Sequence, residues 1–134
     1  MDLIVRTDAN GRAIGPRYVV GISSGSFAGP RLKGRIVGPG GEWGVRTPDG
    51  AYHIDVRFQL ETDDGAIIYL AYGGVIHPFQ VGSQPQQQYW VNTPKFETVA
   101  PTYDWLNRVV CVGVHYSVPR EVGSLAYHVY AISS

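Results

Sequence analysis

The strongest chemical pattern in the sequence is a carboxylate and a guanidinium on one face of a predicted strand. Residues 53–61, HIDVRFQLE, alternate between polar or ionisable and apolar side chains, which is typical of a β-strand with two different faces. Asp55 and Arg57 share the ionisable face. If this face borders an enclosed cavity, burial raises the pKa of Asp55 and makes it a general base, and Arg57 stabilises a developing enolate or oxyanion. In the alternative interpretation, the two side chains form an ion pair on a solvated surface.

The same chemistry extends to the strand that follows. Thr62-Asp63-Asp64-Gly65 separates residues 56–60 from residues 66–70, and its Asp-Gly pair favours a hairpin turn. Tyr69, on the return strand, is predicted to lie near Asp55 and Arg57 as a further group that stabilises charge. His53, on the ionisable face of the first strand, is predicted to contact the substrate.

Glu42 and Trp43 form a second candidate pair. They follow Gly38-Pro39-Gly40-Gly41, where the backbone can bend tightly and direct side chains inward. The functional interpretation is a catalytic carboxyl, Glu42, beside a ring, Trp43, that stacks on a flat substrate at the mouth of a barrel. In the alternative interpretation, Trp43 fills one end of the barrel and Glu42 is solvated.

A third group of candidates lies between residues 97 and 107. Glu97, Tyr103 and Asn107 carry polar groups suited to ligand binding, and Trp105 is suited to form a wall beside the ligand. In the alternative interpretation, Tyr103 and Trp105 are core or interface aromatics and Asn107 holds a turn.

The spacing of other reactive residues argues against the common cofactor sites. The four histidines are scattered, without the short spacings of a zinc site. The glycine-rich stretch 38–41 lacks the spacing and the following helix of a phosphate-binding loop, and the sequence has no Gly-x-Ser-x-Gly elbow. We therefore expect no metal and no cofactor. The histidines are His53, His77, His115 and His128.

The composition limits the partners and the compartment. Eleven basic and eleven acidic residues give a formal net charge of zero, so binding to nucleic acid or to an anionic membrane surface is not predicted. The low charged share, 16%, and the many aromatic residues favour a homo-oligomer, a dimer or a tetramer. Cys111 is the single cysteine and lies in the apolar run 109–114, so we expect a buried thiol and a reducing, cytoplasmic location. No apolar run is long enough to span a bilayer.

Short β-strands are the elements that must position these groups. Apolar and β-branched runs separated by turn residues predict strands, and no window has the apolar spacing of a helix. We expect a glycine-rich bend at 24–30, a turn of helix or a bend at 102–107, and an exposed loop at 82–88 that gates the site. The fold class is all-β, one domain over residues 1–134, forming an antiparallel closed or nearly closed barrel of about eight strands. The predicted strands cover residues 1–5, 18–23, 32–37, 43–46, 56–60, 66–70, 89–92, 96–98, 108–116 and 125–132.

Several short motifs occur along the chain in a set order. They are Gly25-Ser26-Phe27, Gly29-Pro30, Gly34, Gly38-Pro39-Gly40-Gly41-Glu42-Trp43, Asp55-Val56-Arg57, Thr62-Asp63-Asp64-Gly65-Ala66-Ile67-Ile68-Tyr69, Phe96-Glu97-Thr98 and Tyr103-Asp104-Trp105-Leu106-Asn107. In this order they resemble the family called domain of unknown function 3237 (DUF3237). The resemblance implies a small β-barrel of the calycin or allene-oxide-cyclase kind, often oligomeric. The family usually has an aspartate before the tryptophan, where this chain has Glu42.

The function expected from these residues is catalysis without a cofactor, by an isomerase, cyclase or lyase, on an apolar, carbonyl-bearing, natural-product-like substrate. The alternatives are a non-catalytic ligand-binding or carrier barrel and a structural module that oligomerises. The catalytic prediction requires a cavity of at least about 300 Å³ that contains the side chains of Asp55 and Arg57.

Overall fold

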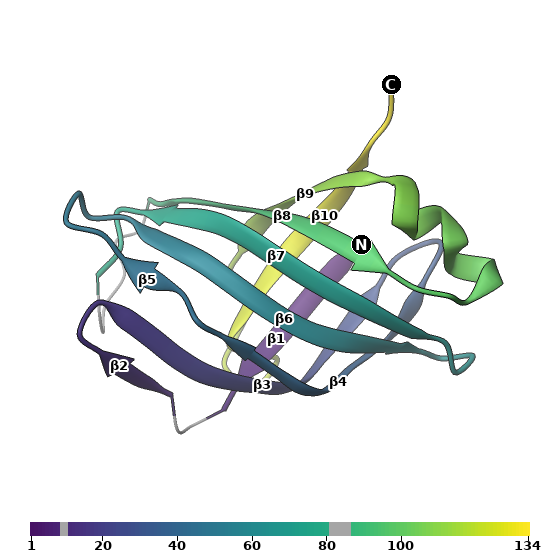
Figure 1. Ribbon diagram of the computed structural model, residues 1–134, viewed down its shortest axis with the longest axis horizontal. Helices are drawn as coiled ribbons and strands as arrows, with labels where there is room; N and C mark the ends of the chain where they lie inside the picture. The colour runs from purple at the N-terminus through teal and green to yellow at the C-terminus, as the bar shows by residue number, and fades with distance from the viewer. Residues whose placement is uncertain (9–10, 81–86) are drawn as a thin grey trace.

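The computed structural model describes residues 1–8, 11–80 and 87–134, and these residues form ten strands and one 3₁₀ helix (Figure 1). Glycine, proline or aspartate directly adjoins six of the ten strands, in line with the turn residues in the sequence. The elements are β1 (Asp2–Thr7), β2 (Arg12–Ile14), β3 (Arg17–Ala28), β4 (Lys33–Glu42), β5 (Val45–Arg46), β6 (Tyr52–Thr62), β7 (Ile67–His77), β8 (Tyr89–Glu97), η1 (Pro101–Arg108), β9 (Val110–Tyr116) and β10 (Leu125–Ile132).

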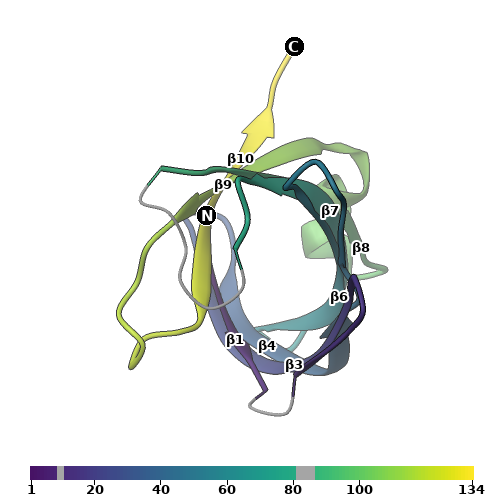
Figure 2. The same ribbon diagram turned by 90° about the vertical axis from the view of Figure 1, so that its left-hand side faces the viewer.

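Eight of these strands close into an antiparallel barrel, which confirms the predicted fold class. Their order is β1-β10-β9-β8-β7-β6-β4-β3, and β3 pairs with β1 to complete the circle. Figure 2 shows this circle from one end of the barrel. The short strands β2 and β5 add to β3 at the edge. Closure pairs the edges that an open sheet would leave exposed.

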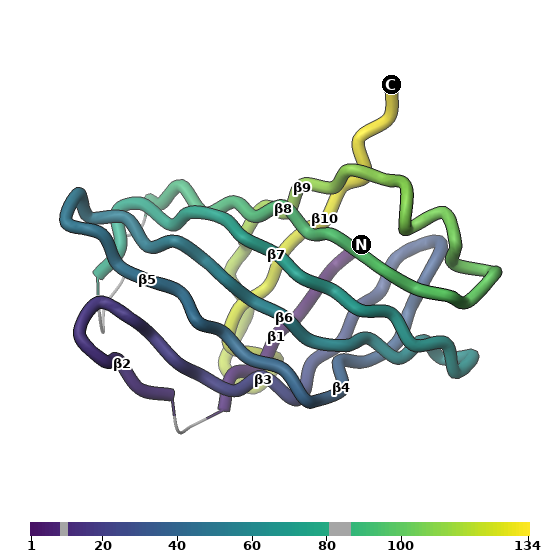
Figure 3. Tube along the Cα trace, viewed as in Figure 1, coloured from purple at the N-terminus to yellow at the C-terminus, as the bar shows by residue number. Residues whose placement is uncertain are grey.

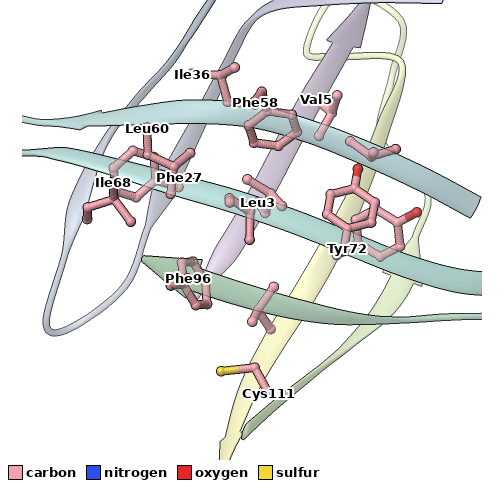
Figure 4. Close-up of a cluster of buried hydrophobic side chains, with 14 of the residues drawn as sticks. Leu3, Val5, Phe27, Ile36, Phe58, Leu60, Ile68, Tyr72, Phe96 and Cys111 are labelled. Carbon is pink, nitrogen blue, oxygen red and sulfur yellow. The ribbon is translucent and has the colours of Figure 1, made fainter. Parts of the chain in front are cut away.

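The barrel interior is apolar, and this fixes the orientation of β6. Phe58 and Leu60 are fully buried, and Figure 4 shows them with Leu3 from β1 and Ile68 from β7 in one inward cluster. A barrel of about eight strands leaves room for little more than its own side chains, so burial of apolar surface decides which face turns inward. The prediction that the ionisable face of residues 53–61 borders an enclosed cavity is therefore wrong.

Two strands continue through residues that were predicted to interrupt them. β8 runs without interruption through Pro94, where two short strands were expected. Pairing between β8 and β9 covers only Val91 and Asn92, so the strand beyond them has a free edge, where proline is tolerated. β3 continues through most of the expected bend at 24–30, as far as Ala28, with an irregularity in its pairing to β4, and the chain turns directly after it. Gly25 lies there at φ +147°, and a Cβ at this position would lie 2.3 Å from the Ile4 carbonyl oxygen.

The two ends of the barrel differ. The trace in Figure 3 places η1 at one end and β2 and β5 at the other. The helix η1 spans the stretch where a turn of helix or a bend was predicted. At the same end, Gly65 at φ +91° completes the turn between β6 and β7, and its N–H donates to the Thr62 carbonyl over 2.9 Å. Among the described residues, no helix has the length and apolar character needed to cross a membrane.

Candidate functional site

A cavity opens into the barrel at the end that carries β2 and β5. Its volume is about 250 Å³, slightly below the size predicted for a catalytic site. Aromatic side chains from five strands and one loop form much of its wall, and isoleucine, valine and leucine side chains lie between them. The aromatic wall, as we call this set, consists of Tyr18, Tyr52, Tyr72, Phe79, Trp90 and Tyr127.

Glu42 brings a carboxyl group into this apolar space. It is the last residue of β4, and its Oε2 accepts a hydrogen bond of 2.9 Å from the Tyr52 hydroxyl. Burial raises the pKa of Glu42, the hydrogen bond from Tyr52 works against this rise, and the charge of Asp55 adds to it. A carboxyl group whose pKa is raised in this way retains its proton to higher pH and can act as a general acid.

Three tyrosines of the wall are neutral hydrogen-bonding groups. Burial raises the pKa of Tyr52 and that of Tyr72. It also raises the pKa of Tyr127, although the indole Nε1–H of Trp90 donates to the Tyr127 hydroxyl oxygen over 2.8 Å. All three phenols therefore stay protonated at physiological pH and can donate to, or accept from, an oxygen of a ligand.

Ring contacts hold the aromatic wall in place. Tyr52 packs against Phe79 with ring centroids 4.6 Å apart, and Tyr72 meets Tyr127 edge-on at 5.5 Å. Trp90 is stacked on His115, with the two rings nearly parallel and 3.6 Å apart. Burial lowers the pKa of His115, so the imidazole beneath Trp90 is neutral. Such contacts stabilise a preformed pocket.

The residues predicted to form the catalytic centre on β6 and β7 lie on the outer surface. Asp55 and Arg57 form a loose ion pair of 3.8 Å, and their side chains are 47% and 59% exposed. His53 is exposed, and Tyr69 is exposed on the outer face of β7. The structure thus agrees with the alternative interpretation of an ion pair on a solvated surface. The correction follows from the pleat, because these residues alternate with the core residues of the same strands.

Trp43 is also exposed on the outer surface. It follows Glu42 directly, and successive side chains on an extended chain point to opposite faces. The structure therefore separates the predicted pair, with Glu42 on the cavity wall and Trp43 outside. Glu42 alone among the predicted site residues lines the cavity.

The predicted group between residues 97 and 107 lies at the other end of the barrel, around η1, and Glu97 is exposed there. The Tyr103 hydroxyl donates to Oδ1 of Asp64 over 2.9 Å. Asn107 accepts from the Thr98 N–H and donates to the Thr98 carbonyl, both over 2.9 Å. These contacts connect η1 to neighbouring turns, so Tyr103 and Asn107 fit the structural interpretation.

Trp105 lies beside a second, smaller pocket at the η1 end. Its ring is covered by the Arg31 guanidinium at 3.6 Å. The pocket has a volume of about 170 Å³ and is lined by apolar side chains, with Cys111 in its wall. Cys111 is buried, as predicted, and burial raises the pKa of its thiol. This pocket holds no carboxyl group comparable with Glu42.

Two further predictions concern the loop and the histidines. Most of the predicted gating loop, residues 82–88, lies outside the residues that the structure describes. Within residues 1–8, 11–80 and 87–134, no three histidine, cysteine, aspartate or glutamate side chains come together as potential metal ligands.

Comparison with known proteins places the barrel in a family. Residues 3–132 match the family model described as "Protein of unknown function (DUF3237)". The chain belongs to this family. Its barrel superimposes on the crystal structure of a beta-barrel like protein from Acinetobacter baumannii AYE with a TM-score of 0.84 and 33% sequence identity, over 97% of this chain and 90% of that one.

Two curated proteins extend the comparison. A UPF0311 protein of Clostridium acetobutylicum is 28% identical over 118 residues, which cover 81% of this DUF3237 chain and 75% of the relative. The hydroalkoxylation enzyme phnH of Penicillium herquei is 27% identical over 106 residues, which cover 79% of this chain and 61% of that enzyme.

The aromatic wall of this DUF3237 barrel was missed by the sequence analysis. Tyr52 continues the inward alternation of Ile54 and Val56 on β6. Tyr72, on β7, pairs with Val56 of β6. In the sequence, such a tyrosine differs from the other inward-facing residues only in its hydroxyl, which seeks a polar partner once the ring is buried.

Proposed function

We propose that this chain is an acid–base catalyst that works without a cofactor on a neutral, apolar, oxygen-bearing small molecule. The observation that carries the proposal is the half-buried Glu42 carboxyl, which lines the cavity beside the aromatic wall and whose pKa is raised. None of the described residues that line the cavity is lysine, arginine or histidine, so a neutral substrate suits it better than an anion. The substrate's rings would lie against the aromatic side chains.

The reaction class that these groups support is ring closure by addition of a hydroxyl group to an alkene. The relative from Penicillium herquei is named for hydroalkoxylation, the addition of an O–H bond across a carbon–carbon double bond. In an intramolecular reaction of this kind, Glu42 transfers its proton to one alkene carbon, and the π electrons form the new C–H bond. The adjacent carbon becomes cationic, and aromatic faces stabilise such a charge.

The proton balance of the cycle is closed by the same carboxyl group. The substrate hydroxyl attacks the cationic carbon and forms the C–O bond, and its proton returns to the Glu42 carboxylate. The product is an isomer of the substrate, so no co-reactant is consumed. Tyr52, hydrogen-bonded to Oε2 of Glu42, would stabilise the carboxylate while it is deprotonated.

The test is turnover of an ortho-alkenylphenol, which carries the hydroxyl and the alkene in one molecule. The native chain should convert it to a cyclic ether and, in D₂O, should place one deuterium on the former alkene carbon. Glu42→Gln should lower the rate by about 10²–10⁴-fold, the usual cost of removing a positioned acid. Glu97→Gln, an exposed carboxylate at the η1 end of the barrel, is the matched control and should retain the native rate.

A rate that is unchanged in Glu42→Gln, or that falls in Glu97→Gln instead, would contradict the proposal. The second candidate is a carrier barrel, which the largely apolar wall of the cavity favours. Saturable binding of each member of a panel of ortho-alkenylphenols, without conversion of any, would establish that alternative and overturn the enzymatic one.

A further inference from the structure

The smaller pocket at the η1 end of the barrel has the features of a second ligand site. Its volume is about 170 Å³, which is close to that of an engineered apolar cavity of about 150 Å³ that binds benzene. No residue lines both this pocket and the larger cavity around Glu42. The pocket is therefore separate from the site of the proposed reaction and has room for a single ring.

The pocket exists because β8 and β9 pair over only a small part of their lengths. Their pairing covers Val91 and Asn92 and does not reach Phe96 on β8 or Cys111 on β9. Phe96, Cys111 and Leu106 of η1 are buried, and all three line the pocket. Removing apolar ligand surface from water against such side chains is favourable. The inner part of the pocket therefore suits an apolar group.

A cation lies at this pocket without an acidic partner. Among the described residues that line it, Arg31 alone has a charged side chain. The Arg31 guanidinium lies 3.6 Å from the centre of the Trp105 ring, which also lines the pocket. Within the described part of the chain, no carboxylate forms an ion pair with Arg31. The ring of Trp105 thus holds a positive charge beside an apolar space.

The acidic residues of the neighbouring β6–β7 turn have other partners. Asp63 pairs with Lys33 at 3.7 Å, and Oδ1 of Asp64 accepts a hydrogen bond of 2.9 Å from the Tyr103 hydroxyl. Neither aspartate lines the pocket. A guanidinium that covers a ring with its face keeps the N–H groups at its edges for a carboxylate. Arg31 is therefore available to an anionic group of a ligand.

We infer that this pocket binds a small monocarboxylate, with its single ring or short aliphatic chain among the side chains of β8, β9 and η1 and its carboxylate on the Arg31 guanidinium. The negative charge of this ligand distinguishes it from the neutral substrate proposed for the larger cavity. Trp105 forms a wall of this site and also holds the guanidinium in place. The inference is independent of the proposed function.

The test compares benzoate with benzamide, a neutral molecule of nearly the same shape. The measured quantity is the ratio of their dissociation constants, Kd(benzamide)/Kd(benzoate), in which changes in apolar packing cancel. The native chain should bind benzoate saturably, and Arg31→Gln should lower the ratio by about threefold to tenfold, the effect of one charged contact near the surface. Arg12→Gln, on β2 at the other end of the barrel, makes the same change of charge and should keep the native ratio.

The place of binding is tested by filling the pocket from its rim. Ala131 lines the pocket and is exposed, so Ala131→Trp adds a ring there while the buried lining residues stay unchanged. This variant should lose saturable binding of both probes. An unchanged ratio in Arg31→Gln, an equal fall of the ratio in Arg12→Gln, or native binding in Ala131→Trp would overturn the inference.

A competition experiment on the native chain separates the two sites without any substitution. The second probe is 2-naphthol, a neutral two-ring molecule chosen for the larger cavity. Benzoate should bind equally well to the free protein and to the protein saturated with 2-naphthol, and benzoate alone should shift the indole N–H resonance of Trp105. Competition between the two probes would overturn the inference, because it would place both in one site.

The outcome is also separable from that of the turnover experiment. Neither benzoate nor 2-naphthol contains an isolated alkene, so the titrations report binding and not conversion. If benzoate binds as expected while no ortho-alkenylphenol is converted, the carboxylate site stands and the proposed function is wrong. If turnover depends on Glu42 while benzoate does not bind, the proposed function stands and the carboxylate site is wrong.

Discussion

Replacing Glu42 with glutamine should stabilise the protein at neutral pH, even though it removes the proposed acid. The amide oxygen of the introduced glutamine still accepts the hydrogen bond from Tyr52, so the change removes the ionisable group and retains the contact. Burial raises the pKa of Glu42 in the folded chain. At a pH between the unfolded and the folded pKa, the folded chain therefore keeps a proton on Glu42 that the unfolded chain has released. Ionising this group therefore costs more in the folded state than in the unfolded state.

The expected size of the effect follows from proton linkage. Below the pKa of the unfolded carboxyl, about 4.3, Glu42 is protonated in both states and contributes its full share of stability. As the pH rises from there through the folded pKa, the native chain loses up to about 1.4 kcal/mol of unfolding free energy per pH unit relative to the glutamine variant. Above the folded pKa, the difference in unfolding free energy between the two proteins stays constant. Its size gives the shift in the pKa of Glu42 between the unfolded and the folded state.

The assay is urea denaturation of both proteins between pH 2 and pH 9. Asp104→Asn gives a comparison of opposite sign, because the hydrogen bond and the charge of Arg108 lower the pKa of Asp104. The native Asp104 carboxylate stabilises the folded chain at pH values above the unfolded pKa. This stabilisation is lost as the pH falls through the folded pKa. A free-energy difference between Glu42→Gln and the native chain that is independent of pH, or that favours the native chain more at higher pH, would refute the reasoning.

Other residues should respond in ways that separate the cavity from the outer surface and from the η1 end. Asp55→Asn and Arg57→Ala should each change unfolding free energy by less than about 1 kcal/mol, as expected for an exposed pair, with unchanged 2-naphthol binding. Asn107→Ala loses both hydrogen bonds to the Thr98 backbone and should cost about 1–3 kcal/mol in urea unfolding without altering that binding; a loss of binding would give Asn107 a functional role. Tyr130→Lys, on the exposed face of β10, should convert the expected homo-oligomer to a monomer in sedimentation at micromolar concentration, and a native chain that is already monomeric there contradicts the expectation.

The fold could be predicted from sequence because its signals are local. Alternating apolar residues and turn motifs define most strands, and Thr62-Asp63-Asp64-Gly65 marks the β6–β7 turn that the structure contains. The lengths of the strands were harder to predict from the sequence. Pro94 and the glycines at 25 and 29 read as interruptions, whereas Pro94 and Gly25 lie within continuous strands whose free edge or irregular pairing accommodates them.

The site was harder to predict because its residues come from distant parts of the chain. Alternation correctly put Asp55 and Arg57 on one face of β6, but it carried no information on which face the barrel would enclose. Glu42 was found from its glycine-rich turn. Its partner Tyr52 lies on the apolar face of β6, where a tyrosine resembles any other core residue. Tyr127 reaches the same cavity from β10, and only closure of the barrel brings it there.

The central claim is that ligands bind inside the barrel, against Glu42 and the aromatic wall, and not on the outer face of β6. The most direct measurement is the set of intermolecular nuclear Overhauser effects between bound 2-naphthol and the protein. We predict cross-peaks from the naphthol rings to the ring protons of Tyr52, Tyr72 and Tyr127. Cross-peaks confined to outer residues such as Tyr69, or to the smaller pocket around Cys111, would contradict the claim.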